Sequence, residues 1–101
     1  QFEVHPNPSP RSRSLIPFVV VLQSHLLAAT PTVIVAPMIP NDERSAYTQT
    51  STLVVFQGRE YIVSTAELAA IDARSLRNAV GDLLDHEDAI RRALDRVFTG
   101  F

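Results

Sequence analysis

Cysteine, tryptophan and lysine are absent from this sequence of 101 residues, and glycine occurs only three times. Without cysteine the chain can form neither a disulfide framework nor a thiolate zinc site, and a reducing compartment suits it. So few glycines argue against a phosphate-binding loop, and no G-x-S-x-G, P-loop or G-x-G-x-x-G pattern occurs. The nine cationic side chains, all arginines, are outnumbered by eleven acidic ones. Because nucleic-acid binding requires a clustered cationic excess, the net charge of −2 argues against direct contact with DNA or RNA.

Long apolar runs are also lacking. The longest, from Leu15 to Leu22, has eight residues and includes Pro17, whereas a membrane-spanning helix needs about 20. No basic region followed by a long apolar stretch is present near residue 1, so no signal peptide is visible. The apolar fraction of 46% is ordinary and supports one modest core. We therefore expect a single soluble, cytoplasmic domain over residues 1–101.

All seven prolines lie within the first forty residues. Proline fixes φ and cannot donate a backbone hydrogen bond, so this part is predicted to form strands and irregular loops. The continuous β-branched run in residues 15–23 is typical of a strand that is buried on both faces. The other predicted elements are a short strand containing Phe2 and Val4, a loop over His5–Ser14, and a strand over Thr32–Ile39 with a bulge or an edge near Pro37.

The second half predicts a hairpin and a helix. Two β-rich runs, 52–57 and 60–63, flank a turn at Gly58-Arg59, after a loop over residues 41–51. Residues 66–84 are expected to hold a short helical turn and a short strand. A helix over about 86–98 follows from helical spacing of the apolar residues Ile90, Ala93, Leu94 and Val97, with Asp85 as N-cap and Thr99, Gly100 and Phe101 as an exposed tail. The fold class predicted is mostly β, a small antiparallel barrel with a C-terminal α-helix.

Few residues suggest catalysis. The three histidines, at 5, 25 and 86, do not have metal-ligand spacing. His86 stands among Asp85, Glu87 and Asp88, which we interpret as a charged first helical turn in preference to an acid–base cluster. No catalytic residue, metal site or cofactor is therefore assigned. The arginines of the helix, Arg91, Arg92 and Arg96, form a stripe that is either a solvated face or a docking surface for an acidic partner.

Two large apolar residues, Phe98 and Phe101, bracket a Thr-Gly pair after the helix. Such residues either pack back onto the core of their own chain or form an interface with a partner. The sequence pattern alone leaves both alternatives open.

Four segments, in order and at the same spacing, resemble the CcdB toxins of type II toxin–antitoxin modules: QFEV at 1–4, VLQSHLL at 21–27, DHEDAIRRAL at 85–94 and VFTGF at 97–101. The resemblance implies a small SH3-like antiparallel barrel with a C-terminal helix that forms a homodimer. It further implies a protein that is not an enzyme. Such a toxin binds the A subunit of DNA gyrase and stabilises the covalent cleavage complex, and a CcdA-like antitoxin neutralises it.

The resemblance also implies site residues. An apolar pair after a Gln-Ser dipeptide contacts gyrase in the family, and it corresponds here to Leu26 and Leu27. The helix end supplies the remaining gyrase-binding positions, Asp95, Thr99, Gly100 and Phe101. The implied dimer interface comprises Val97, Phe98 and Phe101.

Two of these positions depart from the family pattern. The family ends Phe-Trp-Gly-Ile, whereas this sequence has threonine at position 99 in place of the tryptophan, and Asp95 stands where the family tends to have asparagine. A tryptophan at an interface contributes about 2–4 kcal/mol, or roughly 30- to 1000-fold in affinity. Two further hypotheses therefore stand beside a gyrase poison. One is a homologue that binds an antitoxin or another target, and the other is an endoribonuclease of the MazF type, which shares this barrel.

Overall fold

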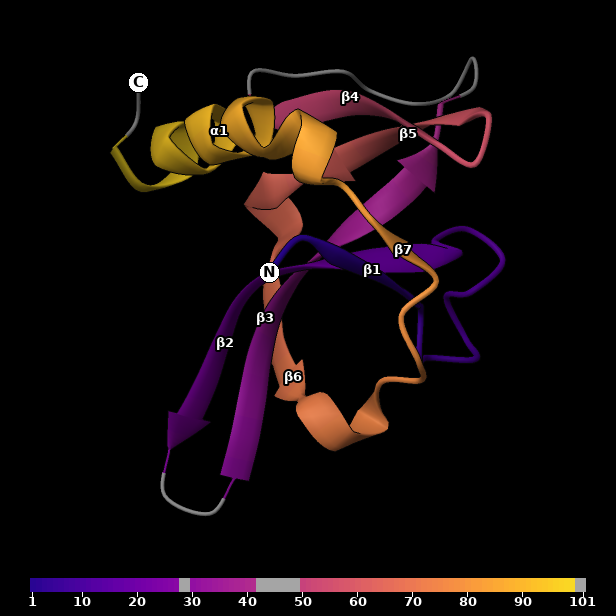
Figure 1. The fold of residues 1–101 in the computed structure, drawn as a ribbon, viewed down its shortest axis with the longest axis vertical. Helices are drawn as coiled ribbons and strands as arrows, with labels where there is room; N and C mark the ends of the chain where they lie inside the picture. The colour runs from indigo at the N-terminus through magenta and orange to yellow at the C-terminus, as the bar shows by residue number, and fades with distance from the viewer. Residues whose placement is uncertain (28–29, 42–49, 100–101) are drawn as a thin grey trace.

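The computed structural model describes residues 1–27, 30–41 and 50–99. It consists mainly of strands, with one α-helix that follows them (Figure 1). Three short 3-10 turns, η1 (Thr65–Glu67), η2 (Ala73–Ser75) and η3 (Leu84–His86), connect the later elements. The remaining elements are β1 (Glu3–Pro6), β2 (Phe18–Leu27), β3 (Thr30–Pro40), β4 (Ser51–Phe56), β5 (Arg59–Ser64), β6 (Ala69–Asp72), β7 (Gly81–Asp82) and α1 (Glu87–Thr99).

All strand pairs among the described residues are antiparallel, in the order β4-β5-β3-β2-β1-β7, and β6 pairs with β3 outside this path. The long strand β3 changes partner along its length. Thr32–Val35 pair with β6, and Met38–Pro40 pair with β5. The sheet curls into a half-barrel, and α1 lies beside β4 (Figure 1). The prediction of a small antiparallel barrel with a C-terminal helix is confirmed.

The predicted burial of β2 on both faces is also confirmed. Val20 and Leu22 belong to the main core, whereas Val19 and Val21 belong to a second cluster on the opposite face. The strand bounds differ from the prediction, since β2 begins at Phe18 and continues to Leu27. Pro17 lies immediately before the strand, and its carbonyl oxygen accepts a hydrogen bond from the Asn7 N–H (3.0 Å).

Of the two alternatives predicted near Pro37, the bulge is wrong and the edge is confirmed, because Pro37 has a partner in β2 and none in β5 or β6. The register of β2 and β3 shifts between Val21 and Gln23, while Pro37 pairs regularly with Val19. Pro37 lies in the gap between the stretch of β3 that pairs with β6 and the stretch that pairs with β5. A proline is tolerated at position 37 because β3 pairs there with β2 alone, so no second ladder requires the missing N–H.

The hairpin of β4 and β5 is confirmed, but its turn lies one residue earlier than predicted. Gln57 and Gly58 are the turn residues, and their φ angles of 52° and 76° are both positive. A two-residue hairpin turn with both φ values positive matches the twist of the flanking strands. Arg59 is therefore the first residue of β5 and pairs with Phe56.

The two chain segments that had the weakest patterns differ most from the prediction. Strand β1 extends through His5 and Pro6, so the following loop begins at Asn7. Val4 belongs to β1 as predicted, whereas Phe2 lies outside the strand, which begins at Glu3; both side chains are buried. The region 66–84 holds two strands and parts of three 3-10 turns, not one strand and one turn. Of the predicted loop 41–51, residues 42–49 lie outside the described residues, and Ser51 already belongs to β4.

The helix is confirmed, with corrections at both ends. Asp85 is not the N-cap, because it lies inside η3, which runs directly into α1. Asp82 instead accepts a hydrogen bond from the Leu84 N–H (3.0 Å) and starts the turn. Thr99 is the last residue of α1 and not part of a tail, while Gly100 and Phe101 lie outside the described residues.

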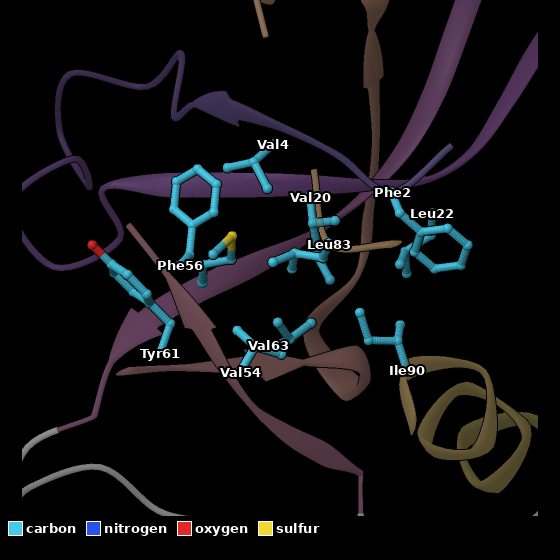
Figure 2. Close-up of a cluster of buried hydrophobic side chains, with 12 residues drawn as sticks. Phe2, Val4, Val20, Leu22, Val54, Phe56, Tyr61, Val63, Leu83 and Ile90 are labelled. Carbon is cyan, nitrogen blue, oxygen red and sulfur yellow. The ribbon is translucent and has the colours of Figure 1, made fainter. Parts of the chain in front are cut away.

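The main core fills the concave side of the sheet (Figure 2). Phe56 packs edge-on against Phe18 and Tyr61, with ring centroids 5.4 and 6.4 Å away. Leu83 and the helix residue Ile90 close the cluster, at 2% and 0% exposure. The core thereby fixes where the helix starts and which of its faces points outward.

Candidate functional site

The C-terminal end of α1 is the first part of the candidate site. Ile90 and Ala93 are buried and Leu94 is half-buried against the core, while the Thr52 hydroxyl donates to the Ala89 carbonyl oxygen (3.3 Å). Phe98 instead is 73% exposed. Of the two alternatives left by the sequence, packing of Phe98 onto the core of its own chain is therefore excluded.

Asp95 and Thr99 lie beside Phe98 in the last turn of the helix, and both are exposed. The Thr99 hydroxyl donates to the Asp95 carbonyl oxygen (2.7 Å), so this proton is already used within the helix. The Asp95 carboxylate adds a negative charge where the helix dipole is itself negative, which is unfavourable. Val97, from the predicted dimer interface, is half-buried.

The arginine stripe divides into two kinds of residue. The Arg91 guanidinium bonds Glu87 (2.9 Å) and the side chain of Gln1 (3.4 Å), and it lies 5.3 Å from the centroid of the Phe2 ring. Arg91 therefore holds residues 1 and 2 against the helix. Arg92, its neighbour, is exposed. Arg91, Arg92 and Arg96 are all exposed, so both interpretations of the stripe, a solvated face or a docking surface, stay open.

His86 joins the start of the helix to the sheet. Its Nε2 accepts a hydrogen bond from the Val55 N–H (3.4 Å) on the outer edge of β4. His5 Nδ1 is bonded to the Arg77 carbonyl oxygen (2.6 Å), far from His86 in the sequence. Among the described residues, no three His, Asp or Glu side chains are grouped as metal ligands would be. The charged turn at residues 85–88 thus contributes to docking of the helix.

Leu26 and Leu27 form the second part of the candidate site, at the end of β2. They pair with Pro31 and Thr30 of β3, in the part of the β2–β3 hairpin that extends beyond β1. Figure 1 shows the end of β2 and the end of α1 at opposite ends of the long axis of the molecule. One chain therefore does not bring the apolar pair and the helix end together. The remaining predicted positions, Gly100 and Phe101, lie outside the described residues.

Sequence reasoning missed one apolar surface, along the outer edge of β4. Leu53 and Val55 are 41% and 56% exposed, and Leu84 of η3 is 55% exposed. The β4 sequence carries no alternation that could have shown it, because residues 53–56 are all apolar; only the burial alternates, with Thr52, Val54 and Phe56 buried between the exposed positions.

A comparison with protein families matches the sequence over residues 1–100 to the family described as CcdB protein. This chain belongs to the CcdB family. A comparison with curated proteins gave no match. The family resemblance derived from residues 1–4, 21–27, 85–94 and 97–101 is therefore confirmed. In the part of the CcdB-family chain that the structure describes, no helix is long and apolar enough to cross a membrane.

Proposed function

We propose that this CcdB-family chain is the toxin of a type II toxin–antitoxin module, that it binds the A subunit of DNA gyrase and that it stabilises the covalent cleavage complex. The observation that supports the proposal is the family match over residues 1–100. The helix end contributes an exposed Phe98 to this function. In this proposal the chain performs no catalysis and needs no cofactor, and residues 1–101 form one cytoplasmic domain.

The gyrase contact in this proposal comprises Leu26, Leu27, Asp95, Thr99, Gly100 and Phe101. Since the end of β2 and the end of α1 are far apart in one chain (Figure 1), a continuous contact requires two chains. A homodimer would supply them, with Val97, Phe98 and Phe101 at its interface. In a two-fold dimer each of these residues occurs twice, so burying both copies of Phe98 would contribute about 3–6 kcal/mol.

A CcdA-like antitoxin is the second partner in the proposal. No direct nucleic-acid contact is invoked, because the net charge is −2 and the acidic side chains outnumber the arginines. The toxin would reach DNA only through gyrase, whose own residues form the covalent bond that the toxin stabilises.

The deciding experiment combines purified gyrase, supercoiled plasmid, ATP and the purified chain, and it scores linear DNA after treatment with detergent and protease. Linear DNA that depends on both proteins is the expected result. A reaction without the chain is the negative control, and a reaction with a known gyrase poison is the positive control. Absence of linear DNA at micromolar concentrations of folded, dimeric protein would rule the proposal out.

A second candidate function rests on position 99. Thr99 offers no aromatic surface, and its hydroxyl is bonded to the carbonyl of Asp95. A CcdB-fold protein that binds an antitoxin but does not poison gyrase would fit this helix end. Such a protein would bind the antitoxin peptide in solution and leave the plasmid supercoiled. Incubation of the same preparation with RNA tests the endoribonuclease hypothesis, which predicts discrete fragments.

A further inference from the structure

A hollow of about 290 Å³ lies on the face of the sheet opposite the main core. Its floor is apolar and comes from two long strands, with Val19 of β2 paired to Pro37 of β3, and Val35 of β3 opposite Ala69 of β6. Val19 and Val35 are 6% and 5% exposed, so only a small part of each side chain is open at the floor. The hollow contains no residue of α1 and none of the proposed gyrase-binding positions.

One wall of the hollow is the loop after β1, and Asn7 holds its shape. The side-chain Nδ2 of Asn7 donates to the Ser12 hydroxyl (2.9 Å) and to the Ile16 carbonyl oxygen (2.8 Å). The side-chain Oδ1 of Asn7 accepts from the Ser9 N–H (3.0 Å). The Arg13 guanidinium donates to the Asn7 carbonyl oxygen (2.9 Å). Asn7 is 5% exposed, and its bonding groups are used within the loop. This wall is therefore preformed, and Asn7 offers no group to a ligand.

The opposite wall carries the single charged side chain of the lining, Glu67 at the end of η1. Glu67 is exposed, and its carboxylate takes part in no hydrogen bond or ion pair with any described residue. Arg13 is not among the lining residues. The hollow thus combines an apolar floor, hydroxyl groups of Ser9 and Ser12, and one unpaired negative charge at its rim.

This combination favours a ligand that has an alkyl chain, or stem, ending in a positively charged group. The stem would lie over the valines and prolines of the floor, and the positive head would meet the carboxylate at the rim, as amphipathic side chains commonly arrange themselves. A volume of about 290 Å³ lies at the lower end of the range of small-ligand pockets, which is about 300–1,000 Å³, and it accommodates one long side chain. We propose that the hollow is a subsite for an arginine or lysine side chain presented by a segment of a partner polypeptide.

The test is an amide NMR titration of the full chain with the capped tripeptides Ac-Ala-Arg-Ala-NH2 and Ac-Ala-citrulline-Ala-NH2. Citrulline has the shape of arginine without its charge. The arginine peptide is expected to shift amides in 7–12 and 67–71 and to bind at least about tenfold more tightly than the citrulline peptide. Equal affinity for both peptides, shifts scattered over other surfaces, or no shifts at tens of millimolar peptide would overturn the proposal.

Three variants locate the contact. Glu67→Gln should weaken binding of the arginine peptide about fivefold or more, and Ala69→Leu should abolish it by filling the hollow from an exposed strand position. Glu60→Gln is the matched control, because it removes an exposed carboxylate that lies outside the lining and can still accept from Asn41. Binding that survives both Glu67→Gln and Ala69→Leu would refute the assignment. Tighter binding of 1-butylguanidine than of the tripeptide would refute a polypeptide as the source.

Discussion

Gly81 lies so close to Phe56 that a Cβ on this glycine would stand 2.6 Å from Cε1 of the phenylalanine ring. The ring cannot move away freely, since it packs edge-on against Phe18 and Tyr61 in the core. The segment 80–83 therefore follows the sheet edge closely at this point, with the Val80 N–H bonded to the Val4 carbonyl oxygen (2.8 Å) and the Leu83 N–H bonded to the Phe2 carbonyl oxygen (2.8 Å).

The first prediction is that Gly81→Ala destabilises the fold by about 1–3 kcal/mol, the usual cost of overpacking a core. Urea unfolding at a fixed protein concentration measures it. Gly58→Asn is the control, because no heavy atom lies within 4 Å of a Cβ there, and asparagine tolerates the positive φ of 76°. Gly58→Asn should destabilise the fold by at most about 1 kcal/mol, because its cost is backbone strain at a positive φ without any steric clash. Equal stability of the Gly81→Ala variant and the unaltered chain would contradict the packing at this site.

A second prediction concerns the contact of the helix with residues 1 and 2. Arg91→Ala should lower the free energy of unfolding by about 1 kcal/mol, since it removes a cation–π contact with Phe2 and an exposed ion pair with Glu87. Arg92→Ala removes the same side chain one position along the exposed face and should have little effect. Thermal unfolding compares the two variants directly. Equal losses in both would show that Arg91 has no special role.

A third prediction concerns Asp72, whose pKa is lowered from 3.8 to about 2. The chief cause is the hydrogen bond from the Arg74 side chain, followed by that from the Arg74 backbone N–H. Because the pKa is lower in the folded state, the stabilising contribution is fully present above pH 3.8 and is lost as the pH falls toward 2. Both side chains are exposed, so this contribution is small.

An NMR titration of the carboxyl carbons should therefore give Asp72 a midpoint near 2. In Arg74→Gln the midpoint should rise toward the ordinary value of 3.8, although the backbone N–H at position 74 still lowers it. Arg77→Gln is the control and should leave the midpoint where it was. A midpoint for Asp72 that does not respond to Arg74→Gln would show that the pair is not formed in solution.

Local patterns predicted the elements that depend on neighbours in the sequence. The run around Val20 indicates a strand buried on two faces, and the spacing of Ile90 and Ala93 indicates one buried face of a helix, because side-chain periodicity acts within an element. The backbone conformation of the β4–β5 turn was harder to predict from the residue types. Gln57 was not expected to adopt a positive φ, which the twist of the hairpin imposes on a residue that is not glycine.

The remaining features depend on distant residues and could not be predicted locally. The change of partner along β3 around Pro37 is decided by where β5 and β6 return to the sheet. The same holds for the candidate site. Sequence resemblance names Leu26 and Thr99 together, but only the fold places the end of β2 far from the end of α1 (Figure 1).

A fourth prediction tests the proposed dimer through two equally exposed apolar residues. Phe98 is 73% exposed and Leu15 is 74% exposed, and they lie in different parts of the fold. Phe98→Asp should raise the dissociation constant of the dimer at least about 100-fold, because the burial of two aromatic rings at the interface is lost. Leu15→Asp should leave it unchanged. Sedimentation equilibrium measures both, and circular dichroism verifies that each variant is folded.

A species near 11.2 kDa is expected for Phe98→Asp at tens of micromolar protein. If the unaltered chain already sediments at this mass, the homodimer proposal is wrong. If Leu15→Asp dissociates the dimer and Phe98→Asp does not, the interface lies on the loop side of the molecule and not at the helix end.

The last prediction concerns Thr99, which the resemblance described above aligns with a tryptophan of the CcdB pattern. Thr99→Trp adds a large apolar and stacking surface to the helix end and should strengthen binding to a gyrase A fragment by roughly 30- to 1000-fold. Because the chain contains no other tryptophan, the fluorescence of the new indole reports the binding directly. The substitution also removes the hydrogen bond from the Thr99 hydroxyl to the Asp95 carbonyl.

Thr99→Val separates the added aromatic surface from the lost hydrogen bond, since valine lacks the hydroxyl and has no aromatic ring. Calorimetry measures the affinity of this variant for the gyrase A fragment. An affinity close to that of the unaltered chain is expected, because the missing ring and not the helix hydrogen bond limits the contact. A gain with valine equal to that with tryptophan would mean that release of the Asp95 carbonyl is what strengthens binding. No gain with either residue would place the gyrase contact away from the end of α1.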